Sequence, residues 1–102
     1  MSRRSKLEGL LEKSPDDVFL NFALAMELAK EGLTDQAVAR FDRVIALDAQ
    51  YIPAHFQKGS TLLAAHRRPE AKAALTRGIE TALAHGDPHA AEEMQALLAG
   101  NL

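Results

Sequence analysis

Apolar residues recur along this chain at intervals of three and four positions, the spacing that places side chains on one face of an α-helix. No stretch alternates apolar and polar residues for long enough to suggest a strand. Glycine, proline, serine and aspartate separate the amphipathic stretches, as they do at helix ends. The pattern predicts six helices, at residues 3–13, 15–31, 35–48, 53–66, 69–85 and 88–99.

Particular residues set the predicted helix boundaries. Ser14 is expected to cap the second helix, with Pro15 in its first turn. Gly32 is expected to end that helix in a left-handed conformation, and Thr34 to cap the next one. Asp87 is expected to cap the last helix. The short connections make consecutive helices antiparallel.

The pattern also repeats at an interval of 34 residues. Ala37 returns as Ala71, and Phe41 returns as Leu75. The first unit reads Asn21-x2-Leu24-Ala25-x2-Leu28, Gly32, Ala37-x3-Phe41 and Ala49, and the second reads His55-x2-Lys58-Gly59-x2-Leu62, His66, Ala71-x3-Leu75 and Leu83. Small residues are expected where the two helices of a hairpin approach closely, with larger apolar residues packed around that contact.

This spacing resembles the tetratricopeptide repeat (TPR) family, whose signature is W-x2-L-G-x2-Y, A-x3-F and P at a period of 34. Asn21 and His55 occupy the tryptophan position of that signature, and Lys58 a leucine position. The resemblance implies a small stand-alone TPR protein with an all-α fold, an α–α superhelix of about six antiparallel helices in one compact domain. Its expected parts are an N-terminal half-hairpin helix (1–14), two TPR hairpins (15–51 and 52–86) and a C-terminal capping helix (87–102).

The last helix fits the repeat only after two extra residues are allowed near His85–Pro88. Met94 and Leu98 then match Leu24 and Leu28. The match suggests an atypical terminal unit, as repeat arrays usually have.

The second helix carries more apolar side chains than its core face requires. Phe19, Phe22 and Met26 form a stripe roughly 140° from the Leu24 face, by helical-wheel arithmetic. In the TPR family the first helix of each hairpin lines the concave surface, where peptides dock. By this resemblance the candidate binding residues are Phe19, Phe22, Met26, Lys30, Phe56, Ser60 and Leu63, with Gln50 and Tyr51 at the rim.

The resemblance implies a protein-interaction module, an adaptor or scaffold for a protein or peptide partner. Chaperone-binding members hold a C-terminal carboxylate with Lys, Asn and Arg, and this chain has Phe22, Met26, Phe56 and Ser60 in those positions. An apolar helix or peptide is therefore the expected ligand. Two alternatives stay open: a homodimer that buries the same stripe, or a C-terminal helix that folds across it through Met94.

Composition narrows the class of protein further. The 12 basic and 14 acidic residues give a net charge of −2, which offers no electrostatic footprint for nucleic acid. The absence of cysteine excludes disulfides and thiolate metal sites. The longest apolar stretch, VFLNFALAM, is too short to span a bilayer, so no membrane partner and a cytoplasmic location are expected.

No enzyme activity, catalytic residue, cofactor or metal site is expected. His85 and His89 are separated by a predicted helix break, and His55 and His66 lie three turns apart, so the histidines are expected to be solvated or to cap helices. Neither a nucleophile elbow nor a glycine-rich phosphate loop is present. A solvated position is expected for the basic residues Arg3, Arg4, Lys6, Arg40, Arg43, Arg67 and Arg68.

Overall fold

The computed structural model describes residues 2–101 of the 102-residue chain. Six helices follow one another along the chain: α1 (Arg3–Lys13), α2 (Val18–Lys30), α3 (Thr34–Leu47), α4 (Ile52–Ala64), α5 (Arg68–Ala84) and α6 (Pro88–Ala99). Residues 2–101 contain no strand. The predicted all-α fold of six helices is confirmed, and the largest boundary difference is at the start of α2.

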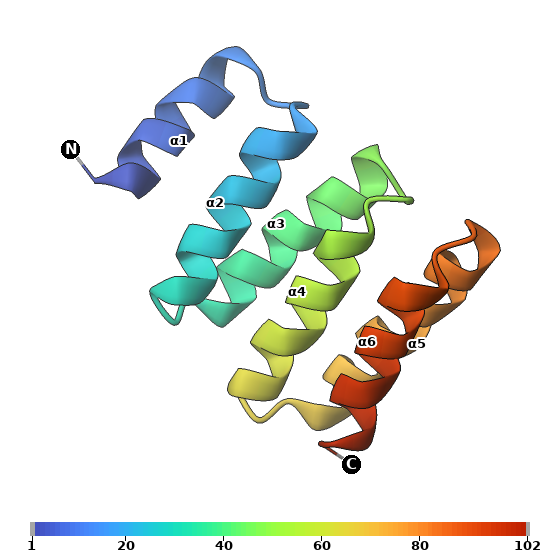
Figure 1. Ribbon diagram of the computed structural model, residues 1–102. Coiled ribbons are helices and arrows are strands. Elements are labelled where there is room, and N and C mark those ends of the chain that lie inside the picture. Colours follow the sequence, from blue (N-terminus) through green and yellow to red (C-terminus); the bar gives the residue numbers. More distant parts are fainter. Residues whose placement is uncertain (1, 102) are drawn as a thin grey trace.

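Each helix packs against the next one in the chain, and α2 also contacts α4. In Figure 1, α2, α4 and α6 lie side by side in one layer, and α3 and α5 lie behind them. The helices α2 and α3 form one hairpin, α4 and α5 form the next, and α6 packs against α5. The predicted superhelix of antiparallel hairpins is therefore observed.

The start of α2 differs from the prediction. Asp17, rather than Ser14, caps this helix, because the Asp17 carboxylate accepts a hydrogen bond from the backbone N–H of Leu20 (2.8 Å). Ser14 instead ends α1, where its own N–H donates to the carbonyl of Leu10 (3.1 Å). The predicted Thr34 cap is also wrong, because Thr34 is already inside α3 and makes no capping hydrogen bond. The predicted Asp87 cap of α6 is confirmed.

Two equivalent turns in the two hairpins use different residues. Gly32 follows α2 with a φ of +77°, as predicted, in the left-handed region that glycine adopts without strain. Thirty-four residues later His66 takes the same turn with a φ of +61°. The prediction that His66 belongs to α4 is wrong, since α4 ends at Ala64. A side chain at this φ is unfavourable, so the second turn is strained relative to the first.

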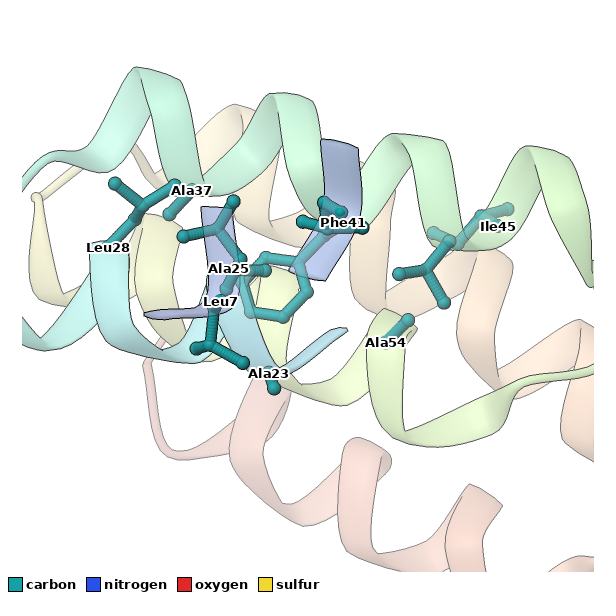
Figure 2. Close-up of a cluster of buried hydrophobic side chains, with 11 residues drawn as sticks. Leu7, Ala23, Ala25, Leu28, Ala37, Phe41, Ile45 and Ala54 are labelled. Carbon is teal, nitrogen blue, oxygen red and sulfur yellow. The ribbon is translucent and has the colours of Figure 1, made fainter. Parts of the chain in front are cut away.

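The core confirms the predicted close approach of helices at small residues. Ala25, Ala37 and Ala71 are fully buried. A β-carbon on Gly59 would stand 2.4 Å from Cδ2 of Leu75, so only glycine fits between α4 and α5 here. Figure 2 shows the ring of the buried Phe41 directed from α3 toward the side chains around Ala25.

The predicted insertion before α6 is confirmed and lies mostly in α5. The first residues of α2, α4 and α6 are separated by 34 and then by 36 residues, and α5 has 17 residues where α3 has 14. Met94 is fully buried, as Leu24 is at the equivalent position. The core face of α6 therefore keeps the register of α2 despite the two extra residues.

Polar side chains fill both positions that hold tryptophan in the TPR signature. Asn21 is fully buried, and its Nδ2 donates to the carbonyls of Pro15 (3.0 Å) and Asp17 (2.8 Å). Arg40 Nη1 on α3 donates to Asn21 Oδ1 (2.9 Å). The Asn21 amide thus ties the α1–α2 loop to both helices of the first hairpin.

His55 occupies the second of these positions and is 1% exposed. The prediction that the histidines are solvated or cap helices is therefore wrong for His55. Its Nε2 lies 3.3 Å from the carbonyl oxygen of Ala49 in the preceding loop. Gly78 on α5 provides the room, because a β-carbon there would stand 2.7 Å from Cβ of His55.

Several of the basic residues expected to be solvated form ion pairs with neighbouring segments while their side chains stay at least partly exposed. Arg3 on α1 pairs with Glu27 on α2 (2.8 Å), and Arg43 on α3 pairs with Asp16 before α2. Arg67 pairs with Asp35 and, at 2.7 Å, with Glu70. These pairs are exposed, so each contributes little to stability.

Candidate functional site

Two adjoining hollows lie along the layer of α2, α4 and α6 seen in Figure 1, which we call the 2-4-6 face. The first hollow, between α2 and α4, has a volume of about 740 Å³. The second hollow, between α4 and α6, has a volume of about 300 Å³. Gln57 on α4 lines both hollows, so the two hollows are neighbours on this helix.

The helical period explains why α2 presents side chains to this face. Leu24 and Leu28 point into the core, where they are 2% and 3% exposed. Met26 lies on the opposite side of the helix and is 37% exposed. Phe19, one turn before Phe22, is 67% exposed, the largest value for an apolar side chain of this size in residues 2–101.

The structure brings three of the predicted site residues together at the first hollow. Met26 and Lys30 line it from α2, and Ser60 lines it from α4. Small residues complete its surface, including Ala29, Gly32 and Ala64. This part of the predicted site is open.

Phe22 and Tyr51 pack against each other and not into the open hollow. Their ring centroids are 5.2 Å apart in an edge-to-face arrangement, and Phe22 makes a second such contact with Phe41 (5.9 Å). Both side chains are half-buried against the core cluster of the first hairpin. Gln50 is exposed in the α3–α4 loop, where its N–H donates to the Asp48 carboxylate (3.0 Å).

Phe56 and Leu63 on α4 face the last helix. Both are half-buried and pack against the cluster that contains Met94 and Leu97 of α6. Phe56 also lines the second hollow. The C-terminal helix therefore half-covers the part of the apolar stripe on α4, whereas Phe19 and Met26 on α2 stay exposed.

Sequence reasoning missed the residues that α6 contributes. Asp87, Ala90 and Glu93 line the second hollow, together with Gln57 of α4. The sequence did contain a sign of their role, because Met94 matches Leu24. This match makes α6 equivalent to α2 and α4, the first helices of the two hairpins. Treating α6 only as a cap left its side chains out of the predicted site.

The two hollows differ in charge. Lys30 and Glu27 line the first hollow, and Glu27 is paired with Arg3 at 2.8 Å. Asp87 and Glu93 line the second hollow, and no lysine or arginine of residues 2–101 lines it. The face thus has a lysine at one end and two carboxylates at the other.

The groups with shifted pKa values lie outside both hollows. Burial lowers the pKa of His55, and the positive charges of Arg77 and Lys58 lower it further, against the opposing effect of the Ala49 carbonyl. The hydrogen bond from Arg67 lowers the pKa of the exposed Glu70. Neither group belongs to the 2-4-6 face.

Within residues 2–101, no cluster of three histidine or acidic side chains could hold a metal ion. No helix in this part of the chain has both the length and the apolar character needed to cross a membrane.

Helix hairpins stacked side by side around buried small residues define the class of α-helical repeat proteins. No family model matches the sequence. The TPR repeat-containing protein PA0015 of Pseudomonas aeruginosa is 30% identical over 92 residues, which are 90% of this chain and 88% of that protein. The chain belongs to the TPR repeat-containing family.

Two solved structures share the fold. The solution structure of protein BPP2914 from Bordetella parapertussis has a TM-score of 0.84 and 26% identity, and the match covers 97% of this chain and 86% of that one. A tetratricopeptide repeat domain protein from Salinibacter ruber has a TM-score of 0.76 and 26% identity, over 85% and 88% of the two chains. TPR folds generally mediate protein–protein interaction.

Proposed function

We propose that this chain is a non-enzymatic interaction module that binds an apolar helix or extended peptide segment on the 2-4-6 face. The observation that carries the proposal is the open first hollow of about 740 Å³ between α2 and α4. It runs between the first helices of two successive hairpins, and its surface combines apolar and uncharged polar groups with the charged side chains of Glu27 and Lys30. A partner side chain can enter it without displacing any part of the core.

Exposed apolar side chains of α2 supply the driving force for binding. Phe19 and Met26 are both accessible, and each Å² of apolar surface removed from water contributes about 25 cal/mol. The flexible thioether of Met26 can adapt to partner side chains of different shape. Ser60 and Gln57 offer hydroxyl and amide groups that can fix the orientation of a bound segment.

Affinity capture with a matched pair of variants tests the proposal. Met26→Glu places a carboxylate at the first hollow, and we expect it to abolish capture of partners that the unmodified chain retains. Leu10→Glu makes the same change at an exposed apolar site on α1 that lines neither hollow. Equal capture by both variants would contradict the proposal, provided that circular dichroism shows both to be folded.

Self-assembly through the same face is the second candidate function. The 67% exposure of Phe19 favours it, because aromatic side chains are enriched at protein interfaces and a two-fold dimer can bury this residue against a second copy of the chain. Light scattering over a range of concentrations distinguishes the two functions. A dimer that Phe19→Glu dissociates supports self-assembly, and a monomer at all concentrations supports a different partner.

A further inference from the structure

The second hollow is lined mainly by apolar residues and by two acidic ones. Ile52, Pro53 and Phe56 line it from α4, and Ala90 and Met94 line it from α6. Asp87, the N-cap of α6, and Glu93, within α6, also line it. Such a combination suits a long side chain with an apolar stem and a positive end.

Neither carboxylate is neutralised by a lysine or arginine of residues 2–101. Asp87 uses one oxygen to accept the N–H of Ala90 (3.1 Å) at the start of α6. Glu93 Oε1 lies 2.8 Å from Nε2 of His89. A carboxylate has two oxygens with several acceptor sites, so both groups retain capacity for a further donor.

We infer that the bound partner segment carries an arginine or lysine, and that the second hollow receives this side chain between Phe56 and the carboxylates of Asp87 and Glu93. The inference rests on the proposed function, because it assigns the chemistry of a segment bound on the 2-4-6 face. The aliphatic stem packs on the apolar lining residues contributed by α4. The positive end lies near the carboxylates and within reach of the Phe56 ring.

The charge at the other end of the face gives the bound segment an orientation. Lys30 lines the first hollow and repels a second cation there. The partner therefore places its apolar side chains at Met26 and its basic side chain at α6. Gln57, which lines both hollows, lies along the path between these two sites.

Selection from a displayed library of random peptides tests the inference. Three immobilised proteins are compared: the unmodified chain, Glu93→Lys and Glu92→Lys. Glu92 is exposed on the same helix but lines neither hollow, so its reversal makes the same change in net charge at a matched control site. We expect arginine or lysine to be enriched in peptides selected on the unmodified chain and on Glu92→Lys, and lost from those selected on Glu93→Lys.

The selected peptides also allow a quantitative test. Replacing the basic residue of the best peptide by methionine should weaken its binding to the unmodified chain by about fivefold, as expected for a partly exposed ion pair. The same replacement should have no such effect on binding to Glu93→Lys. A raised salt concentration should weaken binding of the basic peptide more than binding of its methionine version.

The outcomes separate this inference from the proposed function. If selected peptides require Met26 but show no basic enrichment, or if Glu92→Lys and Glu93→Lys lose the enrichment equally, only the inference is overturned. If no peptide binds, or if Met26→Glu retains the same peptides, the proposed function and the inference both fail.

Discussion

Gly78 on α5 lies so close to His55 on α4 that a β-carbon at residue 78 would stand 2.7 Å from Cβ of the histidine. The same atom would stand 2.6 Å from the sulfur of Met94 on α6. One glycine thus allows three helices to meet around a buried histidine.

Replacing Gly78 by alanine should therefore destabilise the protein. The gain in helix propensity is about 1 kcal/mol, but overpacking of a tight core costs about 1–3 kcal/mol, and neither Cβ of His55 nor the α4 backbone can move away easily. Gly9→Ala is the matched control, because a β-carbon on this α1 glycine meets no atom within 4 Å. Urea denaturation should show a loss for Gly78→Ala and a gain of about 0.5–1 kcal/mol for Gly9→Ala. A gain at both positions would contradict the close approach.

The buried amide of Asn21 should be energetically coupled to Arg40. Asn21→Ala leaves the carbonyls of Pro15 and Asp17 without this donor, and we expect a loss of about 1–3 kcal/mol in the free energy of unfolding. A double-mutant cycle with Arg40→Met measures the hydrogen bond between the two side chains. A coupling energy above about 0.5 kcal/mol is expected, and additive single-variant effects would refute the link.

The strained turn at His66 offers a stabilising substitution. His66→Gly should raise the free energy of unfolding by about 0.5–1 kcal/mol, because glycine adopts a φ of +61° without steric cost. Gly32→Ala, at the equivalent turn of the first hairpin, should lower it by about 1 kcal/mol. Thermal and urea denaturation of both variants check that the free energy of unfolding changes in opposite directions. Loss of stability in His66→Gly would show that the histidine side chain stabilises the turn.

Stability should depend on pH through His55. Its folded pKa lies below its ordinary value of 6.5, so the unfolded chain binds the extra proton first as the pH falls. The contribution of His55 is therefore complete above about pH 6.5 and declines as the pH falls from there toward the lowered pKa. Urea midpoints measured between about pH 5 and pH 8 should rise with pH in this window.

His55→Gln should remove this part of the pH dependence. His85→Gln, at an exposed site after α5, controls for the loss of one histidine. A pH profile that is the same in His55→Gln and the unmodified chain would show that His55 does not carry the effect.

The hairpins could be predicted from the sequence because their contacts are local. Ala37 and Phe41 pack against the helix that immediately precedes them, and the same arrangement recurs 34 residues later, so two independent copies of one pattern support each other. Helix starts were less certain, because both Ser14 and Asp17 can cap a helix. Asp17 caps α2 in the structure, because Ser14 is already the C-cap of α1 and the next residues connect the two helices.

The candidate site was only partly predictable. The helical period placed Met26, Lys30 and Ser60 on a common face, since that placement needs only the 3.6-residue turn and the order of the hairpins. It could not show that Phe22 packs against Tyr51, or that α6 half-covers Phe56. Those facts depend on how far apart neighbouring helices lie.

The sequence by itself determined the class of fold, because hydrophobic period, helix ends and a 34-residue repeat are all local properties of the chain. Only the tertiary structure decided which polar residues are buried and where the face is hollow. His55 and Asn21 are buried because neighbouring helices pack over them, and the residue type alone does not predict this burial. The second hollow has acidic lining residues because the fold places α6 and its N-cap beside α4.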